Sequence, residues 1–310
     1  MPIYTQQITD IGTHGPPPEL TTVAWESPLG QVTILSDWPS GYLVQPGARG
    51  LDMPTFKAYE DESPGIHGNR RRDTKANARE IMIPIAIYAD DGRPAFLERK
   101  RRLLRDLSPL DGDGRGTLTL TEADGSSRSI TAIYASGAEG AEDADSAGRR
   151  WITYGLTWTC ESPFWLGPEF TRTFRGVGDD TPFFPSGVPW VVSDSQVLGT
   201  GVKITNPGDV PAFPVWTISG PISAATFRHP TGGSWTLTRN LSAADVAVID
   251  CRERIETAIL NGTENLWPNI DEAAVLWPLL RGSNTVDLVV AGSTSATTVK
   301  VRLQPRYLSA

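Results

Sequence analysis

Histidine, cysteine and serine most often carry catalysis and metal binding, and their spacing in this chain supports neither. His14, His67 and His229 are far apart, and each lies beside Gly or Pro. They therefore lack the spacing of a zinc-ligand pair. The sequence has no Gly-x-Ser-x-Gly or Gly-x-x-x-x-Gly-Lys motif, and neither Cys160 nor Cys251 has an adjacent histidine. We predict no enzymatic activity, no catalytic residue, no cofactor and no metal site.

Two acidic segments could in principle bind a cation or cleave a sugar. Asp111-Gly-Asp-Gly-Arg-Gly116 has the start of a calcium loop. It lacks the third carboxylate position and the distal glutamate, so a turn between helix and strand is predicted. Glu60, Asp61 and Glu62 could serve a glycosidase if two carboxyls faced each other across a cleft. Acids in a loop rich in Pro and Gly are more often simply solvated.

Tryptophan is abundant, with ten residues in the chain. Exposed rings on a β-sandwich could stack on sugars, which keeps a carbohydrate-binding role open. Trp158, Trp216 and Trp235 alternate with polar neighbours on predicted strands, however. That pattern favours core positions for all three.

The formal charge of −8 conceals a strongly basic segment. Residues 70–105 hold eleven of the 28 Lys and Arg residues against five acids, so this segment carries +6 and the remaining chain −14. Within it we predict a long exposed loop, residues 66–79, whose partner-binding candidates are Arg70, Arg71, Arg72, Lys75 and Arg79. The alternatives are a merely solvated loop, an arm that docks on an adjacent subunit, and an arm that binds another acidic partner. DNA recognition is disfavoured, because the rest of the chain is acidic and no basic stripe with interleaved aromatics is present.

Length and composition predict two domains that fold inside a cell. A chain of 310 residues is longer than one hydrophobic core usually grows. Two cysteines, in different predicted domains, give no disulfide framework. The N-terminus lacks a signal-peptide pattern, and no stretch has the roughly 18 apolar residues of a membrane helix, so no membrane partner is expected.

The N-terminal domain, residues 1–167, is predicted to be a β domain with one helix. The helix near 94–107 begins at Pro94 and has an apolar face that includes Phe96 and Leu103. Asp124-Gly125 is a hairpin signal, and residues 151–160 alternate as a strand. Residues 81–88 also form a predicted strand, in which Pro84 requires an edge position or a bulge.

The C-terminal domain, residues 168–310, is predicted to be an antiparallel β-sandwich. Short alternating runs lie at 201–205, 234–238, 247–251, 285–290 and 297–303. Asn206-Pro-Gly-Asp209 is a tight turn, and Val215, Trp216 and Ile218 form a buried strand that ends at Gly220-Pro221.

Six segments, in order along the chain, resemble distal tail proteins of long-tailed phages that infect actinobacteria and related Gram-positive hosts. They are Gly50-Leu-Asp-Met-Pro54 with Glu62-Ser-Pro-Gly65; Ala78-Arg-Glu-Ile-Met-Ile-Pro84; Trp158-Thr-Cys-Glu-Ser-Pro-Phe-Trp165; Asn206-Pro-Gly-Asp209 with Trp216-Thr-Ile-Ser-Gly-Pro221; Leu276-Trp-Pro-Leu-Leu-Arg-Gly-Ser-Asn-Thr285; and Arg306-Tyr-Leu-Ser-Ala310.

The resemblance implies an N-terminal split-barrel-like β domain with one helix and a C-terminal galectin-like β-sandwich. It implies a structural protein whose N-terminal domains form a hexameric ring at the distal end of the virion tail, assembled in the host cytoplasm. The implied partners are other copies of the chain, the tail tube protein, the tail-tip hub protein or fibres, and the tape measure protein. The sequence does not match the sugar-binding constellation of galectins, so the implied fold carries no sugar-binding prediction. A carbohydrate-binding module that contacts the bacterial envelope is the alternative, followed by a glycan-degrading enzyme.

Overall fold

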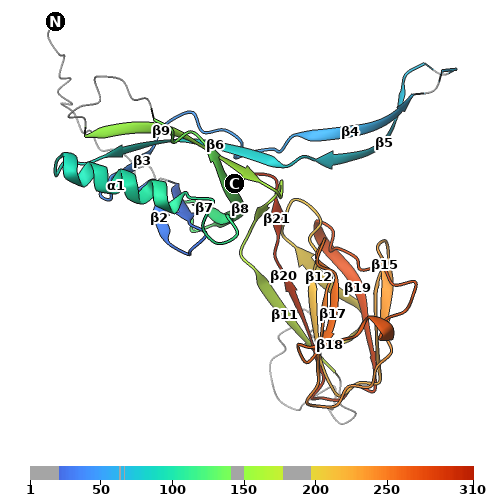
Figure 1. Cartoon of the computed structure of the whole chain (residues 1–310). Coiled ribbons are helices and arrows are strands. Elements are labelled where there is room, and N and C mark those ends of the chain that lie inside the picture. Colours follow the sequence, from blue (N-terminus) through green and yellow to red (C-terminus); the bar gives the residue numbers. More distant parts are fainter. Residues whose placement is uncertain (1–20, 63, 66, 141–149, 177–196) are drawn as a thin grey trace, which may run out of the picture. The chain divides into compact units, whose positions relative to one another are not determined.

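The computed structural model of the chain describes residues 21–62, 64–65, 67–140, 150–176 and 197–310. Their contacts divide the chain into two compact units, residues 1–163 and 164–310 (Figure 1). The described residues are mainly antiparallel strands with one α-helix, which confirms the predicted fold class.

The first unit consists of a barrel-like sheet, a two-stranded hairpin and the helix. Its elements are β1 (Thr22–Glu26), β2 (Val32–Ile34), β3 (Tyr42–Val44), β4 (Phe56–Glu62), β5 (Asn69–Ala76), β6 (Arg79–Tyr88), α1 (Arg93–Asp106), β7 (Gly116–Thr121), β8 (Ser127–Ser136) and β9 (Trp151–Cys160). The strand order β2-β1-β7-β8-β9-β6-β3 describes a nearly closed barrel, and β4 pairs with β5 outside it.

The barrel core follows from strict alternation on the longest strands. Ile81, Ile83, Ile85 and Ile87 of β6 are all at most 1 % exposed, while the intervening side chains face outward. From the described part of β8 and β9, Ile130, Leu156 and Trp158 join them. The predicted hairpin at Asp124-Gly125 connects β7 to β8, with Gly125 at a φ of 83°.

The helix α1 starts beside Pro94, close to the predicted position, and packs its apolar face on the barrel. Phe96 and Leu103 are buried. The Tyr42 hydroxyl donates to the Arg99 carbonyl (3.0 Å), and the Trp25 indole N–H donates to the Asp106 carbonyl (2.7 Å). These two bonds fix the helix to β3 and β1.

Pro84 does not lie on an edge, because β6 is paired with β9 on one side and with β3 on the other. Its carbonyl accepts a hydrogen bond from the Gln45 N–H (2.8 Å). The N–H and C=O of an antiparallel strand residue point to the same neighbour, so the missing donor faces β3. The ladder is interrupted there: Val44 pairs with Ile85, and the next pair is Arg49 with Met82. Of the two alternatives predicted for Pro84, an edge position or a bulge, the irregular pairing corresponds to the bulge.

The second unit is the predicted β-sandwich. Its elements are β10 (Trp165–Leu166), β11 (Phe170–Arg175), β12 (Gly199–Asn206), β13 (Val215–Ser219), β14 (Ala224–His229), β15 (Gly233–Leu237), β16 (Val246–Asp250), β17 (Thr257–Leu260), β18 (Glu264–Asn265), the 3₁₀ turn η2 (Trp267–Asn269), β19 (Gly282–Ala291), β20 (Thr298–Leu303) and β21 (Arg306–Tyr307). One sheet has the order β11-β20-β13-β16-β17-β18, the other β12-β19-β14-β15, and β10 pairs with β21.

A row of aromatic rings forms much of the sandwich core. The Trp216 ring lies 4.8 Å from Phe227 and 5.7 Å from Trp277, and Phe227 lies 4.4 Å from Trp235. All four are fully buried. The core positions predicted for Trp158, Trp216 and Trp235 are therefore confirmed.

Candidate assembly surface

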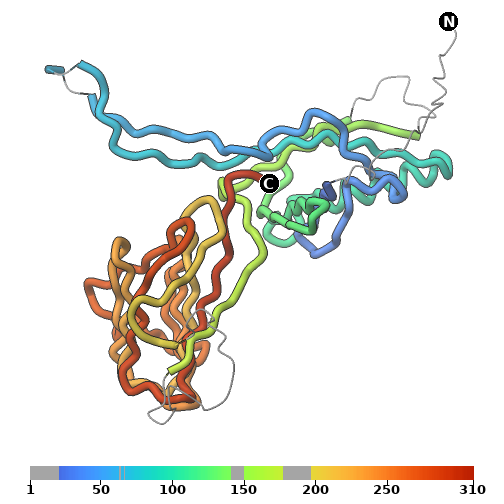
Figure 2. The backbone as a smooth tube through the Cα atoms, turned by 180° about the vertical axis from the view of Figure 1, so that it is seen from behind, coloured from blue at the N-terminus to red at the C-terminus, as the bar shows by residue number. Residues whose placement is uncertain are grey.

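The basic segment predicted as a loop is half of a β-hairpin. β4 and β5 pair antiparallel from Phe56↔Ala76 to Glu62↔Asn69, with a register shift between Tyr59 and Glu60. All seven residues of β4 and most of β5 are exposed. We call β4 and β5 the arm. Figures 1 and 2 show it as a long ribbon that leaves the barrel at the end where β6 begins.

The loop prediction for residues 66–79 is wrong over Asn69–Ala76 because these strands have no buried face. A strand exposed on both sides leaves no alternation of apolar and polar residues for a sequence pattern to detect. The complementary charges of the two strands were the one signal in the sequence that could have indicated a hairpin. Glu60 lies opposite Arg71, and Asp61 lies opposite Arg70.

Two acids of β4 contact polar side chains of β5. The Arg72 guanidinium forms an ion pair with Asp61, and the Asn69 side-chain amide donates to Glu60 (2.9 Å). Both Arg72 and Asp61 are more than half exposed, so the pair contributes at most about 1 kcal/mol to stability. It helps set the register of the hairpin.

Nearer the barrel the arm carries an unfavourable arrangement of like charges. Lys57 and Lys75 lie directly opposite each other. Their ammonium groups lie 5.1 Å and 5.7 Å from the centroid of the Tyr59 ring. Like charges at opposed positions destabilise a hairpin, while the cation–π contacts offset part of that repulsion. An additional anion or aromatic ring on this face of the arm would reduce the repulsion between Lys57 and Lys75.

Arg79 does not belong to the arm surface. It is the first residue of β6 and only 4 % exposed. Its guanidinium donates to the carbonyls of Gly50 (2.7 Å), Asp52 and Pro163 (2.9 Å). Burial lowers the pKa of Arg79 below its usual value, and the neighbouring Cys160 and Asp52 oppose only part of that shift. The structure thus brings Arg70, Arg71, Arg72 and Lys75 together and assigns Arg79 a role in holding the chain around Gly50.

Of the three histidines, His229 has hydrogen-bond partners within the sandwich. His14 lies outside the described residues, and His67 lies between β4 and β5. His229 is 6 % exposed; its Nδ1 accepts from the Thr231 N–H (3.3 Å), and its Nε2 lies 3.2 Å from the side-chain oxygen of Asn284. Among the described residues no group of three or more His, Cys, Asp or Glu is placed to hold a metal ion.

The segment Asp111–Gly116 is a turn, as predicted. Asp113 accepts from the Arg115 N–H (3.0 Å) and pairs with the Arg115 guanidinium (3.2 Å), which also contacts Glu161 (2.8 Å). The carboxylate of Asp113 is therefore bound to a cation of the same loop.

Both cysteines are buried thiols. Burial raises the pKa of Cys160 to about 12, and it also raises that of Cys251. A thiol with a raised pKa is protonated at neutral pH and is a poor nucleophile.

Three of the segments that resemble tail proteins meet in the sandwich. The buried Asn206 amide donates to the carbonyls of Val210 and Leu279 (both 3.0 Å), and its oxygen accepts from the Gly208 N–H (2.9 Å). The Arg306 carbonyl accepts from the Asp209 N–H (2.9 Å). The sequence predicts the local turn at 206–209, but side-chain bonds to residues about 70 positions away have no local signal.

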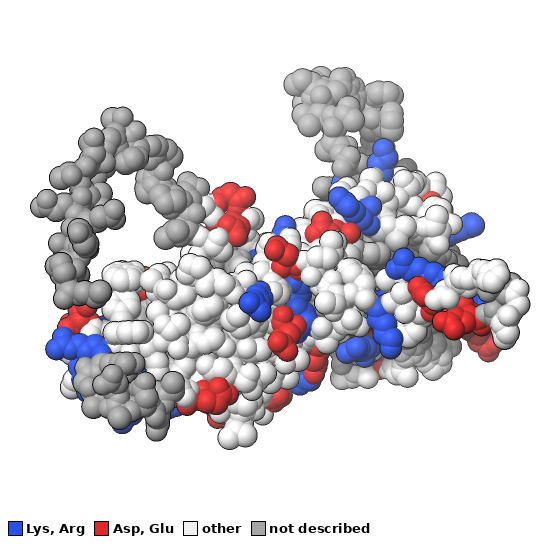
Figure 3. All heavy atoms as spheres, turned by 90° about the horizontal axis from the view of Figure 1, so that it is seen from above, with Lys and Arg blue, Asp and Glu red and all other residues white. Residues whose placement is uncertain are grey.

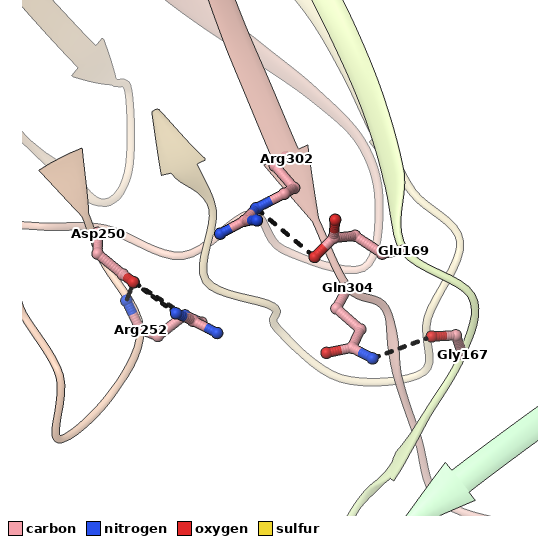
Figure 4. Close-up of polar contacts among 6 residues, drawn as sticks. All are labelled: Gly167, Glu169, Asp250, Arg252, Arg302 and Gln304. Carbon is pink, nitrogen blue, oxygen red and sulfur yellow. Dashed lines mark hydrogen bonds and ion pairs between the residues drawn. The ribbon is translucent and has the colours of Figure 1, made fainter. Parts of the chain in front are cut away.

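Polar groups on the outside of the larger sheet are also paired (Figure 4). Arg252 binds both oxygens of Asp250, at 2.6–3.1 Å, and Arg302 lies 3.6 Å from Glu169. The Gln304 side chain points to the Gly167 carbonyl (3.4 Å). The contacts of Arg302 and Gln304 join β20 and the residues after it to the segment before β11, and the Asp250–Arg252 contact closes the turn after β16.

Charge is mixed on the face of the molecule that Figure 3 shows. On the face in Figure 3, Lys and Arg side chains lie interspersed with Asp and Glu, and neither sign forms a continuous patch. A nucleic-acid-binding face would present a basic stripe along the molecule. No helix in the described part of the chain is long and apolar enough to cross a membrane.

Comparison with known proteins identifies the second unit. Residues 207–307 match the family model described as "Siphovirus-type tail component, C-terminal domain". A comparison with curated protein sequences gives no match.

Solved structures extend the likeness to the rest of the chain. The SPP1 Dit (gp 19.1) protein, described as a paradigm of the hub adsorption apparatus in Gram-positive infecting phages, has a TM-score of 0.62 and 14 % identity. The match covers 93 % of this chain and 99 % of that one. A chain of the phage P2 baseplate in its activated conformation with Ca has a TM-score of 0.47 and 10 % identity, over 91 % and 98 %. The family match at residues 207–307 and the likeness to the SPP1 Dit protein confirm the resemblance to siphophage distal tail proteins. Residues 207–307 thus resemble a siphovirus-type tail component C-terminal domain, and the chain as a whole has a fold similar to that of the SPP1 Dit protein.

Proposed function

We propose that this protein is a structural, non-enzymatic hub at the distal end of a long-tailed phage. Six copies form a ring that connects the tail tube to the tail tip and its host-recognition apparatus. The observation that carries the proposal is the coincidence of a siphovirus tail domain at residues 207–307 with a Dit-like fold over 93 % of the chain. The number six comes from the resemblance to distal tail proteins.

The arm supports self-assembly. Its strands pair with each other and carry mainly exposed side chains, which gives the barrel little of the stability of a packed element. A projecting ribbon of this kind suits contact with a second molecule. In a closed ring, each copy uses two different surfaces, one toward each neighbour, and an arm at one end of the barrel supplies one of them.

The other proposed partners follow from the position of a hub. They are the tail tube protein on one side and the tail-tip protein or fibres on the other, with the tape measure protein inside the ring. The ring assembles in the host cytoplasm and remains in the virion. The carbohydrate-binding alternative loses its main support, because Trp158, Trp216 and Trp235 are buried and cannot stack on a sugar.

The test is the mass of the purified protein by light scattering over a concentration series, with electron microscopy of the largest species. A six-membered ring with a central channel supports the proposal. A chain that stays monomeric at all concentrations, also when mixed with the tail tube protein, overturns the ring.

A charge-reversal series then tests the arm within the ring. Arg71→Glu alone removes a cation and places two acids opposite each other in the hairpin. The double variant Arg71→Glu with Glu60→Arg restores the cross-strand pair but leaves the charges exchanged. If the arm binds a partner through these charges, the double variant folds normally and assembles poorly. Lys300→Glu, an exposed change in the sandwich, is the control.

A further inference from the structure

Two exposed tryptophans and one half-buried tyrosine gather at the end of β6 opposite the arm. Tyr88 ends β6 and pairs with Trp151, the first residue of β9. The Trp38 ring lies 4.4 Å from the Tyr88 ring, and the Tyr88 hydroxyl donates to the Trp38 carbonyl. Trp38 and Trp151 are each 58 % exposed. We call these three residues the aromatic patch.

The aromatic patch is unusual for a surface that faces only water. The other tryptophans of this unit, Trp25 and Trp158, are fully buried. Trp and Tyr are enriched where an interface concentrates its binding energy, because a large rigid ring loses little conformational freedom. No local signal marks these residues, since they are far apart along the chain. The pairing of β6 with β9 places Tyr88 beside Trp151, and Trp38 reaches Tyr88 from the turn before β3.

The charges around the patch are mixed. Asp90 and Asp91 follow directly on β6 and are exposed, while Arg150 precedes β9. Arg99 donates to the Tyr88 carbonyl (2.8 Å) and lies 3.5 Å from Asp91. Burial raises the pKa of Tyr88, and the nearby carboxylates of Asp90 and Asp37 raise it further. Recognition at this site would therefore rest on the rings, with Asp90 available as an anion.

The arm and the aromatic patch lie at opposite ends of the same strand. β5 leads into β6 at Arg79, and the patch begins nine residues later at Tyr88. At about 3.3 Å per residue the two ends are roughly 30 Å apart. Figure 2 shows the arm leaving the barrel at the end away from the start of β9. An arm of one copy cannot reach its own patch without folding back, but it can reach the patch of the next copy in a ring.

The chemistry of the two surfaces is complementary. The arm presents the opposed ammonium groups of Lys57 and Lys75 and the exposed guanidinium groups of Arg70 and Arg71. Cations bind to the faces of Trp and Tyr rings, and Trp binds them best. An aromatic ring or the Asp90 carboxylate placed between Lys57 and Lys75 would also relieve their mutual repulsion.

We infer that the aromatic patch formed by Trp38, Tyr88 and Trp151 is the surface on which the arm of a neighbouring copy of this chain docks. This inference rests on the proposed ring and specifies its contact. Each copy gives its arm to one neighbour and receives an arm from the other, so one interface repeats around the closed circle.

Cross-linking tests the contact directly in the full chain. The two native cysteines are fully buried, so an introduced surface cysteine is the accessible thiol. Ala58→Cys places one on the arm and Asp90→Cys places one beside the patch. The two variants are mixed and treated with a short bismaleimide. We expect a mixed dimer under conditions in which the wild type forms rings. Lys300→Cys in place of Asp90→Cys is the matched control and should give none.

Substitutions test the energetics. Trp38→Ala combined with Trp151→Ala should raise the concentration needed for half-assembly at least about tenfold, and Lys57→Ser with Lys75→Ser should do the same. Trp267→Ala, which removes a partly exposed ring from the sandwich, is the control. Circular dichroism of each variant confirms that the barrel is folded.

The outcomes separate the inference from the proposed function. A wild type that does not assemble, alone or with the tube protein, overturns the ring. A wild type that forms rings while the mixed dimer is absent, and while both double variants assemble like the control, overturns the inference and leaves the ring intact. Loss of assembly in both double variants, together with the mixed dimer, supports both.

Discussion

Asp250 is a carboxylate that the sandwich keeps ionised although it is only 6 % exposed. Burial raises the pKa of Asp250, but the hydrogen bonds from the Arg252 guanidinium and backbone N–H outweigh burial and hold the pKa below its usual value. A group whose pKa is lower in the folded than in the unfolded chain stabilises the fold above the unfolded pKa. That contribution is lost as the pH falls through the folded pKa.

Arg252→Gln should therefore destabilise the sandwich in a pH-dependent way. At pH 7 we expect the free energy of unfolding to fall by about 1 kcal/mol, because the carboxylate loses its bidentate partner. The difference from the wild type should shrink below about pH 4, where the unfolded Asp begins to take up its proton. Urea denaturation between pH 2 and pH 7 measures it. Arg281→Gln, at an exposed position, is the control. A difference that stays constant down to pH 2 would contradict the role of Asp250.

At the scale of single residues, the sequence predicts burial better than contacts. The three core tryptophans follow from alternation with polar neighbours. The role of Arg79 does not, because its three carbonyl partners come from two distant segments that only the folded barrel brings together. The same holds for Asn284, whose side chain binds the carbonyls of Ile204, Leu280 and Gly282.

At the scale of elements, β1 and β7 approach so closely that one position excludes a side chain. A Cβ on Gly116 would lie 2.4 Å from both the Trp25 ring and the Glu26 carbonyl. The Trp25 ring cannot move away easily, because its N–H is bonded to the end of α1. Gly116 therefore determines how α1, β1 and β7 pack together.

Gly116→Ala should lower the free energy of unfolding of the first unit by about 2 kcal/mol or more, since the clash involves backbone and a fixed ring. Gly65→Ala is the matched control, because a Cβ at that position meets nothing within 4 Å. Thermal unfolding of the two variants beside the wild type measures the difference. Equal melting temperatures would show that β1 and β7 can move apart at this position without loss of stability.

Most elements could be predicted because they have one buried face. The helix at Arg93–Asp106 and the strand at Trp151–Cys160 show the 3.6- and 2-residue periods of such elements. The arm could not be predicted in this way, because its strands have no buried face. The aromatic patch could not be predicted for another reason. Strand register determines which surface residues become neighbours, and the register cannot be read from a single sequence.

At the scale of the whole molecule, both halves of the inferred contact lie in the first unit. A fragment of residues 164–310 should therefore fold and stay monomeric. The sandwich has its own continuous core, from Phe174 to Leu303, so its folding should not require the barrel. Light scattering of this fragment beside the full chain measures its mass in solution. Rings formed by the sandwich alone would show that the assembly surface lies in the second unit, which would contradict the inferred contact.

The exposed basic residues of the arm also make it a site of cleavage by trypsin-like proteases. Trypsin cleaves after Lys and Arg in extended, accessible backbone, and β5 alone offers Arg70, Arg71, Arg72 and Lys75. In a free copy these bonds are open to attack, while in a copy whose arm lies on a neighbour they are covered. In the proposed ring, the rate of tryptic cleavage in this short stretch would thus report how quickly the arm becomes covered.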